Sequence, residues 1–346
     1  MDIEKLYYRV KEALSSLDIG SIWPGFEPLA FALYDSEKCF FDGGYVEKTD
    51  EFCANTSIVY HGRQIAVWMV QEELDTAVLA SKLVHEMFHG FQELRGWSCR
   101  PNELEALFKY SHSAENLSVK LRENQILVSL LDRFDEAAYR ELLSLRRLRS
   151  MRFPYEFAYE SMVEEIEGSA NYVEWQALKR LDPRAAQALE ERMRAFVTDP
   201  RRLFPIRVAC YFTGALMIHA MRAAGDYSFE PAERPAITPI LMDVRPSSGD
   251  FPGKDRLLLQ AERAVKEYRQ ATEAIVRAAV ERNNVVLEGP CELTFLNVYD
   301  ARRLDDYLTS TYFLAYRDGG GDGMLHGDFV ILMKDERTIS RVYSRE

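Results

Sequence analysis

The sequence of 346 residues predicts an α+β protein with a small mixed sheet near the N-terminus, a mainly helical middle and a β-rich tail. Three observations favour this fold class: short strand-like runs early in the chain, a long stretch with helical apolar spacing, and new strand-like runs near the C-terminus. We therefore expect three parts, residues 1–70, 71–285 and 286–346.

The N-terminal part is expected to combine one helix with a few strands. Residues 2–17 place apolar side chains at helical spacing, and residues 29–34 form an apolar run typical of a strand. Two further runs, 57–60 and 64–69, flank His61-Gly62-Arg63. Because glycine tolerates the backbone angles of a tight turn, this segment predicts a β-hairpin.

The middle part is expected to be helical. Apolar residues from Val78 to Leu94 recur at three- and four-residue steps and stop before Gly96, which is typical of a helix with a glycine after its last turn. Proline-marked boundaries separate further predicted helices at 102–131, 133–151, 155–181, 184–196, 206–223 and 255–283. The proline-rich segment 225–254 predicts a long connection.

The tail is expected to be β-rich. Strand-like runs occur at 293–299, 311–316 and 329–333. The glycine-rich segment 319–323 lacks the lysine of a phosphate loop and the spaced acidic residues of a calcium loop, so we interpret it as the connection between the last two runs.

Composition excludes several classes of partner. With 43 basic against 55 acidic side chains the formal charge is −12, which argues against nucleic acid and anionic membranes. The basic cluster Arg146, Arg147, Arg149 and Arg152 is expected on the solvated face and last turn of a helix. Five scattered cysteines and the lack of a long apolar run predict a cytoplasmic protein without membrane spans, and the oligomeric state stays open.

The segment His85-Glu86-Met87-Phe88-His89 carries the chemistry. Histidines four residues apart share one helix face, so both imidazoles can bind a single Zn²⁺. Glu86, offset by one residue, can act as general base toward a water molecule at the metal. The chain holds only six histidines, which makes this pair conspicuous. Zinc then needs a third protein ligand, and no further histidine follows His89 closely.

A carboxylate from the predicted helix over 155–181 can complete the set, because several polar side chains share one face of it: Glu160, Glu164, Glu167, Asn171 and Glu174. Glu156 and Glu165 are expected on a solvated face. Within this helix, Glu167-Gly168-Ser169-Ala170-Asn171-Tyr172-Val173-Glu174 resembles the E-G-x-A-x-Y-x-E segment of gluzincin metallopeptidases, which include thermolysin and the neutral aminopeptidases.

The resemblance implies a thermolysin-like zincin core in which Glu167 is the third zinc ligand. Gly168 is then expected where this helix packs on the motif helix, and Asn171 and Glu174 lie where they could orient a ligand histidine. In gluzincins the strand before the motif helix is a sheet edge that pairs with substrate backbone, a place that residues 64–69 fill here.

A group that stabilises the oxyanion is expected beside the metal. The stretch from Tyr211 to Leu216 resembles the Y-x-x-G-x-x-L segment of the neutral aminopeptidases, which implies Tyr211 as the donor. His219 on the same predicted helix is the rival, and His326 is a third choice.

The sequence thus predicts a zinc-dependent metallopeptidase with a peptide or protein substrate. His85, His89 and Glu167 would bind Zn²⁺, Glu86 would activate water and Tyr211 would stabilise the oxyanion. Two alternatives stay open: a non-catalytic zinc protein that keeps the zincin fold for binding, and a zinc hydrolase of non-peptide amides or esters. Endopeptidase and exopeptidase action are both compatible with the sequence.

Overall fold

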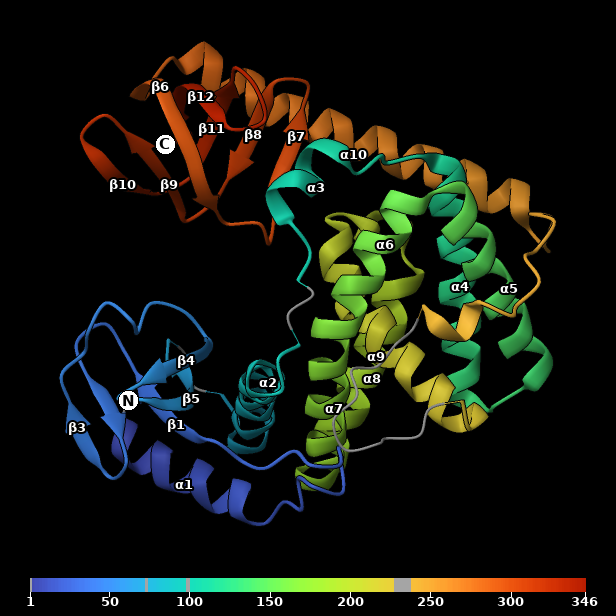
Figure 1. Ribbon diagram of the computed structural model, residues 1–346, viewed down its shortest axis with the longest axis horizontal. Helices are drawn as coiled ribbons and strands as arrows, with labels where there is room; N and C mark the ends of the chain where they lie inside the picture. The colour runs from blue at the N-terminus through green and yellow to red at the C-terminus, as the bar shows by residue number, and fades with distance from the viewer. Residues whose placement is uncertain (1, 72–73, 98–99, 227–237) are drawn as a thin grey trace.

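The computed structural model describes residues 2–71, 74–97, 100–226 and 238–346. It confirms a mixed α/β protein with a small mixed sheet at the N-terminus and an antiparallel sheet at the C-terminus (Figure 1). Cys99 and residues 227–237 of the predicted connection 225–254 lie outside the described residues, and the four described cysteines are free thiols. Among the described helices, none is both long enough and apolar enough to cross a membrane.

The N-terminal sheet has the strand order β3-β2-β1-β5-β4. Its strands are β1 (Ala30–Tyr34), β2 (Cys39–Phe41), β3 (Gly44–Val46), β4 (Thr56–Tyr60) and β5 (Arg63–Met69). Helices α1 (Ile3–Ser15) and α2 (Thr76–Leu94) share a core with Phe31 and Leu33, whereas the alternating Ala32 and Tyr34 belong to a second apolar cluster.

The predicted hairpin is confirmed, since Tyr60 pairs with Arg63 across a turn in which His61 and Gly62 both have positive φ. The prediction that residues 64–69 form a sheet edge is wrong. Strand β5 pairs in parallel with β1 and antiparallel with β4, so both of its sides are hydrogen-bonded. The edge strands of this sheet are β3 and β4, and β4 is the other strand of the same hairpin. Alternation in a sequence cannot show which distant strand, here β1, covers a strand's second side.

In the helical part, most helices begin and end close to the predicted residues, and the exception is the predicted helix over 102–131. Its α-helices are α3 (Glu103–Lys109), α4 (Ala114–Asp132), α5 (Glu136–Arg152), α6 (Pro154–Val163), α7 (Ser169–Leu181), α8 (Pro183–Thr198), α9 (Ile206–Ala224) and α10 (Lys254–Arg282), with short 3₁₀ turns at Pro200–Leu203 and Pro239–Leu241. A single helix over 102–131 was the wrong expectation. Tyr110 is extended and Ser113 caps the next helix through its side chain, so α3 and α4 are separate.

The C-terminal sheet is antiparallel throughout, with the order β10-β9-β6-β12-β11-β8-β7. Its strands are β6 (Val285–Leu296), β7 (Arg302–Leu304), β8 (Tyr307–Ser310), β9 (Phe313–Asp318), β10 (Gly321–His326), β11 (Phe329–Met333) and β12 (Thr338–Ser344). The glycine-rich segment turns β9 back into β10, a strand that the sequence did not suggest. Leu104, Leu107 and Phe108 of α3 pack against this sheet.

Two of the four clustered arginines are buried, which corrects the prediction of a solvated face. Arg146 and Arg149 are about 1% and 0% exposed, whereas Arg152 at the end of α5 is exposed. They belong to a cluster of alternating charges, here called the buried ion-pair cluster: Lys120, Glu123, Arg146, Arg149, Glu160 and Glu164. Glu156 and Glu165 are also buried, against expectation.

Candidate metal and catalytic site

Helix α2 carries His85, Glu86 and His89. Asp75 caps its first turn by accepting hydrogen bonds from Ala77 and Val78. The helix lies close on the N-terminal sheet at Gly90, where an added Cβ would come within 3 Å of side chains of Leu29, Ser57 and Gln64. This packing turns the opposite face of α2 toward α7 and fixes the direction in which the two histidines point.

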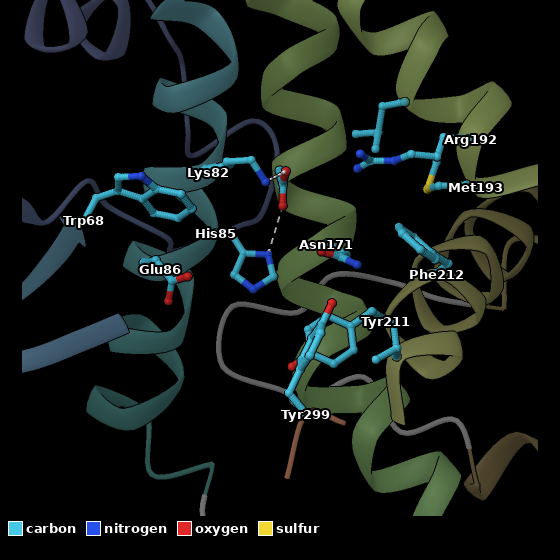
Figure 2. Close-up of a pocket in the computed structure, with 13 residues that line it drawn as sticks. Trp68, Lys82, His85, Glu86, Asn171, Arg192, Met193, Tyr211, Phe212 and Tyr299 are labelled. Atoms are coloured by element: carbon cyan, nitrogen blue, oxygen red, sulfur yellow. Dashed lines mark ion pairs between the residues drawn. The ribbon is translucent and has the colours of Figure 1, made fainter. Parts of the chain in front are cut away.

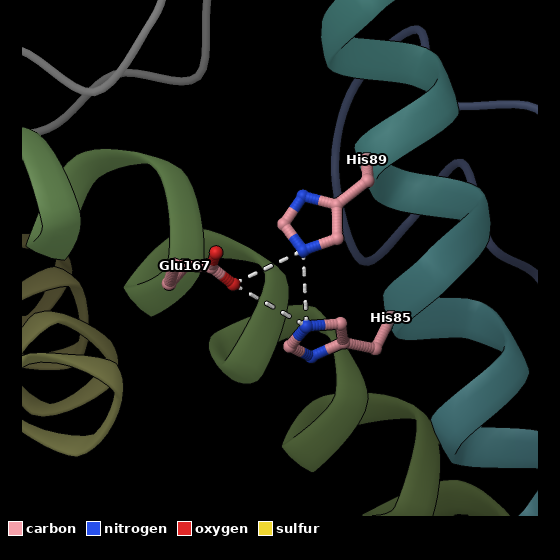
Figure 3. Close-up of side chains that lie close together, drawn as sticks. All are labelled: His85, His89 and Glu167. Carbon is pink, nitrogen blue, oxygen red and sulfur yellow. Dashed lines mark hydrogen bonds and ion pairs between the residues drawn. The ribbon is translucent and has the colours of Figure 1, made fainter. Parts of the chain in front are cut away.

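The two imidazole rings converge on one point, as Figure 3 shows. The Nε2 atoms of His85 and His89 are 3.1 Å apart, and the rings meet nearly edge to face. Each ring therefore presents one nitrogen to the same small volume, as the spacing in the sequence predicted.

Glu167 completes the group from a π-helical turn, Glu164–Gly168, between α6 and α7. Its Oε2 is 3.2 Å from His89 Nε2 and 3.8 Å from His85 Nε2 (Figure 3). One donor atom from each of the three residues lies within 4.8 Å of the others. The wider turn changes the register along the helix, so that Glu164 points into the buried ion-pair cluster while Glu167 points to the histidines.

Gly168 packs on a different helix from the one that the sequence led us to expect. A Cβ at Gly168 would lie 2.5 Å from the Cα of Gly214 on α9, and a Cβ at Gly214 would lie 2.5 Å from the carbonyl oxygen of Glu164. The expectation of contact with the motif helix is therefore wrong. The two glycines allow the backbones of the π turn and α9 to touch, which sets the position of Glu167.

Two polar side chains hold the outer nitrogens of the histidine rings. Gln92 Oε1 lies 2.8 Å from His89 Nδ1, and the Gln92 amide donates to the carbonyl of Ile166 and the hydroxyl of Ser169. Glu174 Oε2 lies 3.1 Å from His85 Nδ1, an ion-pair contact whose angle falls short of an aligned hydrogen bond. Glu174 thus lies where the sequence suggested an orienting residue, whereas Gln92 was missed.

Arg207 of α9 is a second residue that the sequence did not reveal. Its guanidinium donates to Glu167 Oε1 at 2.7 Å and to the Tyr211 hydroxyl at 3.2 Å. It also forms a short ion pair with Glu103 of α3, which in turn accepts a hydrogen bond from Tyr159. Tyr211 lies one turn from Arg207 on α9, whereas Glu103 and Glu167 belong to segments far away in the chain, so no local pattern could have identified those two carboxylate partners.

The charges at the site stabilise one another. Burial by itself would raise the pKa of Glu167, but His89, His85 and Arg207 hold that pKa well below its usual range. Burial favours the neutral His85 ring, yet Glu167 and Glu174 outweigh it and raise the pKa of His85 to about 10. Burial raises the pKa of Glu86, and the two histidines only partly oppose this shift.

Tyr211 reaches the site, whereas its two rivals lie elsewhere. Its ring lies nearly parallel to that of His85 at a centroid distance of 6.5 Å. Burial, followed by the nearby Glu167 carboxylate, raises the pKa of Tyr211 well above its usual value, so the hydroxyl keeps its proton. His219 instead packs against Trp175, and His326 ends strand β10 of the C-terminal sheet.

Two cavities meet at the site. His85, Glu86 and Tyr211 line both of them. The larger cavity, about 450 Å³, extends past His89 and Glu167 to Thr56 and Ser57 of β4, Arg207, and Phe295 and Val298 of the C-terminal part. The smaller cavity, about 200 Å³, extends to Trp68, Arg192 and Tyr299 (Figure 2). His85, Glu86 and Tyr211 therefore lie where the two cavities meet, and a cavity extends from them on each side.

The donor set fits a metal ion. Two imidazole nitrogens and a carboxylate oxygen that face one another need a proton or a cation between them. A second group, Glu160, Glu164 and Cys210, could in principle hold a metal as well. There, however, Lys120 Nζ already lies 2.8 Å from Glu160 and 3.2 Å from Glu164. Among the described residues, the first group is thus the better candidate.

Comparison with known protein families, with curated proteins and with solved structures found no match to this chain.

Proposed function

We propose that the chain is a zinc-dependent metallopeptidase of gluzincin type. The observation that carries this proposal is the placement of Glu86 beside three convergent donors, His85, His89 and Glu167, at the junction of two cavities. A binding protein without catalysis needs no half-buried carboxylate beside the three donors. The proposal includes a thermolysin-like zincin core, for which the resemblance of the glutamate helix is the support.

Two imidazoles and one carboxylate occur in catalytic zinc sites and also in non-haem iron sites, and the H-E-x-x-H spacing is what favours zinc here. Three protein ligands leave one position for a water molecule. When bound, zinc would lower the pKa of that water and polarise the carbonyl of the scissile bond. Gln92 would keep the Nδ1 proton of His89 in place, so that its Nε2 lone pair is free to bind the metal.

The protein's own groups would move the protons. The half-buried Glu86, whose pKa is raised, would accept the proton of the attacking water and pass it to the leaving amine. Tyr211, still protonated, would donate a hydrogen bond to the developing oxyanion. The free edge of β4, which contributes Thr56 and Ser57 to the larger cavity, could pair with an extended substrate.

Metal analysis combined with peptide cleavage tests the proposal. The purified chain should hold one zinc ion and cleave members of a mixed peptide library, read by mass spectrometry. His85→Ala should lose the zinc. Glu86→Gln should keep it and lose activity by about a hundredfold or more, because only the base is removed. Glu136→Gln, a change of an exposed glutamate that lines neither cavity, is the control and should stay active.

Two results separate the alternatives. Stoichiometric zinc without cleavage of any peptide, ester or amide would favour the non-catalytic zinc protein. Cleavage of small esters or amides without cleavage of peptides would favour the non-peptide hydrolase. If the parent binds no zinc and His85→Ala behaves like it, the metal site itself is refuted.

A further inference from the structure

The smaller cavity has a distinct chemical character. It lies between α2, α7, α8 and α9, with Tyr299 of the C-terminal part on its rim, as Figure 2 shows. Much of its wall is apolar: Trp68, Leu189, Met193, Val208 and Phe212. Its volume of about 200 Å³ suits one side chain better than a longer peptide segment. The cavity begins at His85 and Glu86, so a group inside it would be next to the reacting bond.

Two cations face this apolar cavity. Lys82 lies 3.7 Å from Glu174 and 5.6 Å from the centre of the Trp68 ring, so its charge is partly engaged. Arg192 on α8 points its guanidinium toward the cavity (Figure 2). Within the described residues, Arg192 has no ion-pair or hydrogen-bond partner for its side chain. Arg192 is an exposed residue whose positive charge helps to lower the pKa of Glu174 without an ion-pair contact, so its guanidinium remains able to form a two-pronged bond to an anion.

The larger cavity differs from the smaller one in the pairing of its arginines. Its arginines are already paired, Arg100 with Glu93 at 2.5 Å and Arg207 with Glu167 at 2.7 Å. Acidic side chains outnumber them in its lining, since Glu86 and Glu103 are present as well. The smaller cavity is lined by two acidic side chains, Glu86 and Glu174, and by two basic ones, Lys82 and Arg192, so it is the less acidic of the two cavities and the better place for an anion.

We propose that the smaller cavity is a specificity pocket for a carboxylate-bearing residue of the substrate. The proposal rests on the hydrolase function proposed above. Arg192 binds the carboxylate, Lys82 adds positive charge, and the apolar walls hold the aliphatic stem. The carboxylate can come from an acidic side chain or from a free C-terminus, since both offer the same two oxygens.

Matched peptides test the pocket with the full-length, zinc-loaded protein. A library peptide that is cleaved is remade with Glu, Gln or Lys at each position beside the scissile bond. At one position the parent should prefer Glu over Gln by about tenfold in kcat/KM. In Arg192→Gln this ratio should fall to about one, and Arg192→Glu should favour Lys. Arg184→Gln, an exposed arginine of the same helix outside both cavities, should keep the parent's ratio.

The same peptides made with a free or an amidated C-terminus distinguish the two sources of carboxylate. If the preference for Glu over Gln persists in amidated peptides, the pocket binds an acidic side chain. If peptides with a free C-terminus are preferred and this preference is lost on amidation, the pocket binds the C-terminal carboxylate. If the parent shows neither preference, or if Arg192→Gln retains it, the inference is wrong.

A binding measurement separates this inference from the hydrolase function. Glu86→Gln is titrated with the Glu and Gln peptides, and binding is followed by calorimetry. If no peptide is cleaved at all, the proposed function fails, while about tenfold tighter binding of the carboxylate peptide, lost on adding Arg192→Gln, still supports the pocket. Equal binding of both peptides would overturn the pocket whatever the activity.

Discussion

The ring of His89 and the side-chain amide of Gln92 are joined by a contact of 2.8 Å between Nδ1 and Oε1. Because Oε1 can only accept, Nδ1 of His89 carries a proton. In the neutral ring the lone pair is then on Nε2, the atom that faces His85 and Glu167. The same amide donates to the carbonyl of Ile166, next to Glu167 in the chain. Gln92 therefore couples two of the three proposed ligands.

Replacing Gln92 should weaken metal binding more than folding. In Gln92→Met the side chain keeps its length but loses all three hydrogen bonds, to His89, Ile166 and Ser169, so zinc affinity should fall by about 10- to 100-fold. Competition with a chromophoric chelator measures this change. The same substitution at Gln187, an exposed residue of α8, is the control and should leave the affinity unaltered. Equal affinities in the two variants would contradict the proposed role of Gln92.

Tyr211 and His219 can be separated by kinetics. If Tyr211 stabilises the oxyanion, Tyr211→Phe should lower kcat by about a hundredfold with little change in KM, because the lost hydrogen bond forms mainly in the transition state. His219→Gln should be close to the parent, since that ring packs against Trp175 away from both cavities. A strong loss in His219→Gln with none in Tyr211→Phe would reverse the assignment.

The contact between Gly168 and Gly214 predicts an unusual response to alanine. Alanine in a helix interior is normally more favourable than glycine by about 1 kcal/mol. In Gly168→Ala the new Cβ would meet backbone atoms of α9 at 2.5 Å, so the free energy of unfolding should instead fall by about 2 kcal/mol. Gly319→Ala, with no atom within 4 Å of the added Cβ, serves as control in denaturant unfolding. A Gly168→Ala protein as stable as its parent would refute this account of the helix crossing.

The buried ion-pair cluster predicts a defined dependence of stability on pH. Burial by itself would raise the pKa of Glu164, but Arg146 and Lys120 lower it far below its ordinary value. Because the pKa is lower in the folded state, this stabilisation is complete above the unfolded value of about 4.3 and is lost as the pH falls further.

Glu164→Gln should therefore lower the free energy of unfolding by about 3 kcal/mol at pH 7 and make its decline in acid shallower. Urea unfolding between pH 3 and pH 7 measures both effects, because carboxyl groups of the unfolded chain titrate in about that range. Glu136→Gln breaks an exposed pair with Arg140 and should cost less than about 1 kcal/mol. A parallel pH profile in Glu164→Gln and the parent would contradict the expected pKa shift.

The sequence predicted what depends on local spacing. The two histidines share a face because four residues make about one helical turn, and most helices have the expected bounds because prolines and caps mark them. The proximity of Glu167 to the histidines agrees with the resemblance of its segment, whereas its role as a zinc ligand stays a proposal.

The features that were missed depend on partners far apart in the chain. The carboxylates that accompany Arg146 and Arg149 come from α4, α6 and the π turn, so the leucines of α5 could not reveal that these arginines are buried. The partner of Gly168 is on α9, and β5 is covered on its second side by β1. Periodicity shows which face of an element is apolar and leaves open what packs there.

The residues that line the two cavities are synthesised at very different times during translation. The three donors and Glu86 lie in the first half of the chain, whereas Phe295, Val298 and Tyr299, which help to line the cavities, belong to its last fifth. During translation the donors leave the ribosome well before these residues are synthesised. A nascent chain thus contains the three donors and Glu86 before it can form complete walls around them. If the chain is the hydrolase proposed above, that delay would spare neighbouring unfinished polypeptides from cleavage until the tail has folded.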